Sequence, residues 1–110
     1  MVTLAARRGD VFLVALNPTR GREMRKTRPC VVVSPDELNA HLHACIVAPL
    51  TGASKPYPFR VPCRFEGKQG QVVLDQLRTV DRERMVRRLG RVSPSVESRV
   101  LATLQELFAN

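Results

Sequence analysis

The fold is decided by the stretch VFLVALNPTRGREMRKTRPCVVV, which runs from Val11 to Val33. Its two ends, residues 11–16 and 30–33, are short apolar runs rich in β-branched side chains, and this pattern predicts two buried strands. The segment between them, Asn17–Pro29, is polar and contains Pro and Gly, which are typical of loops. We therefore expect a connection between two strands, and loops held by a rigid sheet commonly carry binding groups.

This connection, residues 17–29, is strongly basic. It holds five cations and one anion, Glu23, so it carries a net +4 of the chain's +8. The cations are Arg20, Arg22, Arg25, Lys26 and Arg28. Guanidinium groups match phosphate through paired donors, which favours a nucleic-acid partner over the alternative of a solvated hairpin tip. The lone carboxylate is expected to stay ionised among these cations, a state suited to accepting a proton.

Length and composition indicate one globular domain, residues 1–110. The chain is 44% hydrophobic and 25% charged, which is ordinary for a folded domain with one modest core. No stretch approaches the roughly 18 to 20 apolar residues that span a bilayer, and the first residues lack the apolar core of a signal peptide. We therefore expect a cytoplasmic protein that does not contact membranes.

The cysteines and histidines indicate neither a disulfide frame nor a metal site. Cys30, Cys45 and Cys63 are odd in number and lie in separate apolar runs, so they are expected to be free core residues. His41 and His43 alternate with Cys45, but no second pair of ligands accompanies them, and we expect no metal.

Other local patterns predict a mainly β fold with short helices. Strands are expected over residues 11–16, 30–34, 44–50, 57–61 and 71–77, with residues 86–92 open between strand and coil. Ser34 and Asp81 are expected to cap short helical turns that reach Asn39 and Met85. Ser93 begins a C-terminal amphipathic helix. The sum is a small, twisted, mostly antiparallel barrel or sheet covered by one helix.

Two of the predicted strands contain residues that strands seldom hold. Pro58 and Pro62 lack an N–H donor, so the strand over residues 57–61 is expected at a sheet edge. Asp75 lies within residues 71–77 beside apolar neighbours, where an unpaired carboxylate is costly. Arg78 is its nearest candidate partner in the sequence.

The sequence lacks the motifs of most enzyme classes. It has no nucleotide-binding glycine loop, metal-ligand cluster, Ser-His-Asp set or Cys-x-x-Cys pair. The polar groups near predicted strand ends are Glu23, Arg28, Thr51, Asp75, Gln76 and Arg78. Such groups suffice to cleave RNA through its own 2'-hydroxyl: a base removes the hydroxyl proton, cations stabilise the charge on the phosphate, and neither metal nor cofactor is required.

The chain also resembles MazF/PemK-type toxins, in segments that follow one another in the family's order. These segments are residues 8–11 (RGDV), 17–23 (NPTRGRE), 27–34 (TRPCVVVS), 49–51 (PLT), 55–61 (KPYPFRV) and 75–81 (DQLRTVD). The resemblance implies an SH3-like (CcdB/MazF-type) small antiparallel barrel plus a C-terminal amphipathic helix, assembled as a homodimer. It implies a ribosome-independent endoribonuclease, an mRNA interferase, that cuts single-stranded RNA to leave 2',3'-cyclic phosphate and 5'-hydroxyl ends. It also implies neutralisation by a MazE-like antitoxin.

The family's motifs assign roles to individual residues. Glu23 matches the glutamate that serves as general base, Arg28 the arginine that binds the scissile phosphate, and Thr51 the threonine that donates a hydrogen bond to it. Asp75 matches an aspartate of the Kid branch implicated in catalysis or base contact. The residues expected to bind RNA are Arg20, Arg22, Arg25, Lys26, Lys55, Asp75, Gln76 and Arg78.

Two positions depart from the Kid branch. Arg22 stands where that branch has histidine, and because arginine stays protonated at ordinary pH it cannot shuttle a proton. The general acid is therefore unassigned. Val73 replaces an arginine two positions before Asp75, which weakens the support for that aspartate.

Two other functions fit part of the sequence. A toxin of related fold inhibits DNA gyrase through a C-terminal Trp-Ile pair, whereas this chain has no Trp and ends at Phe108, Ala109 and Asn110. A basic barrel that binds nucleic acid without cleaving it would show binding that weakens steeply with salt.

Overall fold

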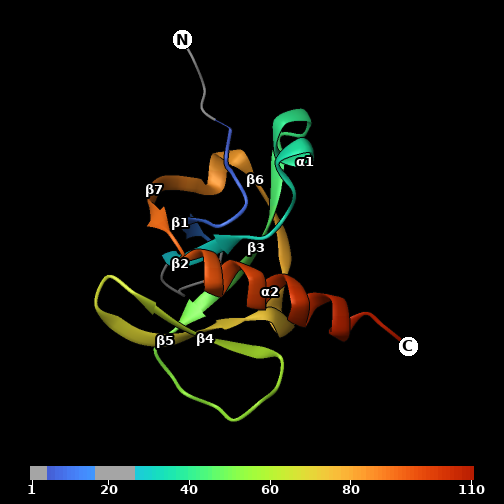
Figure 1. The fold of residues 1–110 in the computed structure, drawn as a ribbon. Coiled ribbons are helices and arrows are strands. Elements are labelled where there is room, and N and C mark those ends of the chain that lie inside the picture. The colour runs from blue at the N-terminus through green and yellow to red at the C-terminus, as the bar shows by residue number, and fades with distance from the viewer. Residues whose placement is uncertain (1–4, 17–26) are drawn as a thin grey trace, which may run out of the picture.

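The computed structural model describes residues 5–16 and 27–110 as a mainly β protein with short helices, as predicted. The strands are β1 (Asp10–Ala15), β2 (Thr27–Val32), β3 (Ala44–Thr51), β4 (Arg60–Phe65), β5 (Lys68–Val73), β6 (Arg78–Asp81) and β7 (Met85–Arg91). The helices are α1 (Asp36–His41) and α2 (Pro94–Leu107), with short 3-10 turns η1 (Leu74–Gln76) and η2 (Arg82–Arg84). Figure 1 shows α2 running alongside β4.

All the strand pairs are antiparallel, in the order β4-β5-β3-β2-β1-β7, with β6 paired to β3. Val47 of β3 pairs with Val32 of β2 and also with Arg78 of β6, so β6 lies on the edge of β3 away from β2. The end of β3 pairs with β5 instead. The strand β3 therefore pairs with three strands, and its last residues pair with β5.

The sheet curls, which agrees with the expected small barrel. A Cβ atom placed on Gly90 of β7 would lie 3.4 Å from the ring of Phe65 of β4, so the two outer strands of the sheet approach each other. Because side chains alternate along a strand, the sheet has two apolar faces. One face packs around Val11, Val31, Ala48, Val72 and Val100 of α2, and the other around Val14, Cys30, Val32, Cys45 and Val47.

Several predicted boundaries were wrong. The strand β2 begins at Thr27, so Arg28 lies within a strand paired to β1 and not in the loop. The strand β4 begins at Arg60 and contains Pro62. It pairs only with β5 among the strands described, which confirms its predicted edge position and explains why a residue without an N–H donor is tolerated. Residues 86–92, left open, fall mainly in β7.

The predicted strand over residues 71–77 was also wrong. It ends at Val73, and the turn η1 leads the chain from β5 to β6, so Asp75 is not on a strand. Ser34 does not cap α1: its hydroxyl donates to Asn39 and accepts from the Ile46 N–H, while Pro35 precedes the helix. The other cap predictions are confirmed.

Asp81 accepts a hydrogen bond from the Glu83 N–H at the start of η2, and Ser93 accepts one from the Val96 N–H at the start of α2. The three cysteines are free and buried, as expected. Within residues 5–16 and 27–110, no helix is long and apolar enough to cross a membrane.

Candidate functional site

Some of the predicted site residues lie outside the described part of the chain. These are Arg20, Arg22, Glu23, Arg25 and Lys26. The described ones are Arg28, Thr51, Lys55, Asp75, Gln76 and Arg78. The structure therefore shows where the residues of the second group lie.

Arg28 and Thr51 lie on one face of the sheet, at the ends of neighbouring strands. The last pair of the β2–β3 ladder is Cys30 with Pro49. Arg28 is two residues before Cys30, and Thr51 is two residues after Pro49. Since side chains two residues apart share a face, both side chains point to the same side as Cys30 and Pro49. The two strands thus bring an exposed guanidinium and a half-buried hydroxyl to the same end of that face.

Arg78 joins this face from the other side of β3. It pairs with Val47, which is two residues before Pro49 and shares its face. Burial raises the pKa of the Cys30 thiol to about 12, while Arg28 and Arg78 both act to lower it. Two exposed cations and the Thr51 hydroxyl therefore share one face of the sheet with the buried Cys30 thiol.

The Thr51 hydroxyl is anchored but can still donate. Its oxygen accepts a hydrogen bond from the Ala53 N–H at 3.1 Å, which leaves the hydroxyl hydrogen for another acceptor. Two residues further on, Lys55 is exposed, and its backbone is held by the buried side chain of Gln71. The Lys55 N–H donates to Gln71 Oε1 at 3.1 Å, and Gln71 Nε2 donates to the Lys55 carbonyl at 2.8 Å.

Asp75 pairs with Arg60, so its predicted partner, Arg78, was wrong. Arg60 Nε lies 3.2 Å from one carboxylate oxygen and Nη2 lies 3.3 Å from the other. The same guanidinium sits 5.2 Å from the centre of the Tyr57 ring. The reason is the turn η1, which directs Asp75 towards β4 while Arg78 follows in β6 on the Cys30 face. Gln76, the neighbour of Asp75, is exposed.

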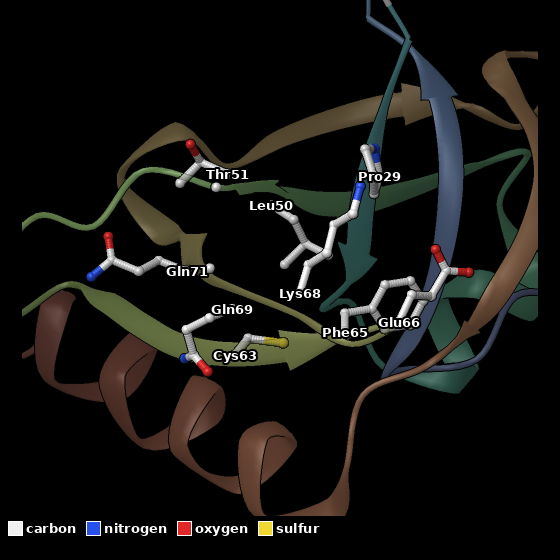
Figure 2. Close-up of a pocket in the computed structure, with 11 residues that line it drawn as sticks. Pro29, Leu50, Thr51, Cys63, Phe65, Glu66, Lys68, Gln69 and Gln71 are labelled. Carbon is white, nitrogen blue, oxygen red and sulfur yellow. The ribbon is translucent and has the colours of Figure 1, made fainter.

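A cavity of about 230 Å³ lies next to these strand ends (Figure 2). Leu50, Phe65 and Lys68 are among the residues that line it. Figure 2 shows the Lys68 side chain reaching towards Pro29, whereas the Thr51 side chain points away from the cavity. Thr51 itself lines the cavity together with Pro29 and Leu50. The cavity therefore adjoins the end of β3 that carries Thr51.

The model of a family described as the PemK-like, MazF-like toxin of type II toxin–antitoxin systems matches residues 7–108. The chain belongs to this family.

Individual relatives agree with the family match. The endoribonuclease toxin MazF of Escherichia coli strain K12 is 33% identical to this MazF-like chain over 101 residues, 91% of each protein. Endoribonuclease MazF9 of Mycobacterium tuberculosis is 38% identical, with 79% of this chain and 82% of the relative covered. Among solved structures, a MazE–MazF structure (Form-II) from Deinococcus radiodurans superposes with a TM-score of 0.83 at 28% identity, covering 96% of each chain.

In this MazF-like toxin, a second polar cluster holds the fold together. Asp10 is buried, and its carboxylate accepts hydrogen bonds from Arg91 Nη1 and from the Arg7 N–H, both at 2.9 Å. Arg88 Nε lies 3.3 Å from the same carboxylate. Through Asp10, these contacts join Arg7, which precedes β1, to Arg88 and Arg91 of β7, the strand that pairs with β1. The cluster is fully paired, which indicates a structural role.

Within residues 5–16 and 27–110, one group of side chains has the chemistry and spacing of possible metal ligands. Ligand atoms of His43, Asp81 and Glu83 lie within 4.8 Å of one another, and all three residues are exposed. Asp81 already caps η2 and lies 3.7 Å from the His43 ring. Those contacts account for the cluster without an ion.

Sequence reasoning missed Arg60, Gly70 and Gln71. Gln71 had a visible signal: it precedes two valines in a predicted strand, and a buried amide side chain needs hydrogen-bond partners. Gly70 lies within β5, and the sequence around it gives no sign of its close approach to β3. Arg60 had no local signal, because its partner lies 15 residues away in the sequence.

Proposed function

We propose that this PemK/MazF-like toxin is a sequence-specific, ribosome-independent endoribonuclease that cleaves single-stranded RNA, acting as an mRNA interferase. The observation that carries the proposal is the shared face of Arg28, Thr51 and Arg78, which puts two guanidinium groups and one hydroxyl donor on the same side of the sheet. The named activity of the relatives from Escherichia coli and Mycobacterium tuberculosis supports it.

The proposed reaction uses the nucleophile of the substrate. The 2'-hydroxyl of a ribose loses its proton, its oxygen attacks the adjacent phosphorus, and the bond to the 5'-oxygen of the next nucleotide breaks. The products carry a 2',3'-cyclic phosphate and, after protonation, a 5'-hydroxyl. Glu23 is proposed as the base that takes the first proton. No metal or cofactor is needed for this chemistry.

The protein's contribution is positioning and charge. Negative charge builds up on the non-bridging phosphate oxygens in the transition state, and donors placed there beforehand stabilise it. Arg28 is proposed to give paired hydrogen bonds to these oxygens, with Arg78 as a second cation. Thr51 donates its hydroxyl hydrogen, which the Ala53 contact leaves available.

Other residues are proposed to hold the RNA strand on either side of the cut. Lys55 and Gln76 are both exposed. Asp75 holds Arg60 and so fixes η1, from which Gln76 is presented. The remaining proposed RNA contacts are Arg20, Arg22, Arg25 and Lys26.

We further propose a homodimer that is neutralised by a MazE-like antitoxin and acts in the cytoplasm, where mRNA is translated. The solved MazE–MazF structures from Deinococcus radiodurans support the antitoxin. The chain's net charge of +8 favours an acidic segment as the part of the antitoxin that binds.

Incubation of the purified protein with a long single-stranded RNA in the presence of a chelator tests the proposal. The wild type is expected to cut at recurring short sites and to leave cyclic phosphate ends, and a 2'-deoxy substitution at the cut site is expected to block the reaction. Arg28→Ala and Thr51→Ala should cleave RNA about 100-fold more slowly or worse. Arg99→Ala, which removes an exposed arginine of α2, should keep the wild-type rate. Salt-sensitive RNA binding without any cleavage would refute the proposal and leave a basic binding barrel.

A further inference from the structure

Gly70 of β5 lies directly against the backbone of Thr51. A Cβ atom built on Gly70 would overlap the Thr51 carbonyl oxygen and lie 3.2 Å from the Thr51 carbonyl carbon. The backbone of Gly70 is not left-handed, so any residue could adopt its conformation. Glycine is needed at this position because of space alone. The strand β5 approaches the end of β3 more closely than a side chain at residue 70 would allow.

The next residue, Gln71, holds the other end of the same segment. It pairs with Thr51 in the β3–β5 ladder, and its buried amide exchanges two hydrogen bonds with the backbone of Lys55. Between these points, the Thr51 hydroxyl accepts the Ala53 N–H. Two consecutive residues of β5 therefore fix both ends of residues 51–55, and the orientation of the Thr51 hydroxyl depends on that short segment.

We propose that Gly70 and Gln71 are positioning residues for Thr51 in RNA cleavage. The inference rests on the proposed function, because it takes Thr51 to donate to the scissile phosphate. A side chain at residue 70 would push the end of β3 away, and a displacement on the order of 1 Å at a catalytic group can cost about 100-fold in rate. The loss should fall on kcat, with little change in KM, because phosphate contacts made in the transition state are affected more than binding of the whole strand.

A matched pair of glycine variants tests this inference. Gly70→Ala adds a methyl group against the Thr51 carbonyl, whereas Gly52→Ala adds the same group next to Thr51 in the sequence, where nothing lies within 4 Å. We expect Gly70→Ala to lower kcat by about 100-fold and Gly52→Ala to cleave RNA like the wild type. Hydrogen exchange of the Ala53 amide should become faster than in the wild type in Gly70→Ala and be unchanged in Gly52→Ala.

A second set of variants separates positioning from a general effect on folding. In a Thr51→Ala background, Gly70→Ala should lower kcat no further, since the group that it positions is gone. If Gly70→Ala does not fold, Gln71→Met serves instead, because it removes the two hydrogen bonds to Lys55 and adds no atom next to Thr51. We expect Gln71→Met to lower kcat by about 3- to 10-fold, again with no effect when Thr51 is absent.

The results distinguish the two proposals. If the wild type does not cleave RNA, or Thr51→Ala cleaves it normally, the proposed function fails and this inference fails with it. If wild type and Thr51→Ala behave as expected but a folded Gly70→Ala retains the wild-type kcat, only the inference is overturned. The same conclusion follows if Gly70→Ala unfolds and Gln71→Met has the wild-type kcat, or if either variant slows the Thr51→Ala enzyme further.

Discussion

Replacing Asp75 by asparagine should destabilise the protein by about 2 kcal/mol. The Arg60 side chain is only 14% exposed and the Asp75 side chain 33% exposed, so the variant leaves a largely buried guanidinium without its counter-charge. Breaking a fully buried pair costs about 3–5 kcal/mol, and an exposed pair contributes about 0–1 kcal/mol. The two contacts, at 3.2 and 3.3 Å, are long for charged groups, which places this pair between these limits.

Thermal and urea unfolding measure this effect, and about 2 kcal/mol corresponds to a fall in Tm of roughly 9 °C for a chain of this length. Arg60→Met is the matched control: it keeps an apolar stem, and the carboxylate left behind is more exposed, so we expect a smaller loss of about 1 kcal/mol. Folded Asp75→Asn should cleave RNA at nearly the wild-type rate. An unchanged Tm together with a large loss of cleavage would refute the structural role and make Asp75 part of the reaction.

Two further predictions concern Cys30 and Glu23. The pKa of Cys30 is raised to about 12 from an ordinary 9.0, so the unfolded chain ionises this thiol first, and stability should fall as the pH rises from about 9 to 12. Urea unfolding of Cys30→Ala should show a shallower fall, by at most about 1.4 kcal/mol per pH unit, and an identical slope would contradict the assigned burial. Glu23→Gln should cut RNA far more slowly, because the general base is lost. It should bind RNA as well as the wild type or better in a gel-shift assay, because the change also removes a negative charge from a cluster of cations. Cleavage by Glu23→Gln at the wild-type rate would refute the role of Glu23 as general base.

Local patterns were enough to predict much of this fold. The apolar runs of β1 and β3 are visible as alternation or β-branched stretches, and the Ser93 cap with its proline marks the start of α2. Each of these signals depends only on a few neighbouring residues of the sequence. The mainly β architecture closed by one helix follows from them.

The errors arise where distant parts of the chain decide the outcome. Residues 71–77 have an alternation that fits one strand, but β3 pairs with β5 at its end and with β6 along its first half, so the chain must turn at η1 in between. The partner of Asp75 depends on that turn. The register that puts Arg28 and Thr51 on one face is likewise fixed by pairing between strands, which no local motif encodes.

The central claim is that Arg28 and Thr51 act on the same phosphate. A double-mutant cycle on the single-turnover cleavage rate tests it most directly, with Arg28→Ala, Thr51→Ala and the double variant checked for an intact fold. We predict that each single variant loses about 100-fold or more and that the double variant is little slower than the slower single one. Losses that simply multiply, or a single variant with the wild-type rate, would contradict the claim.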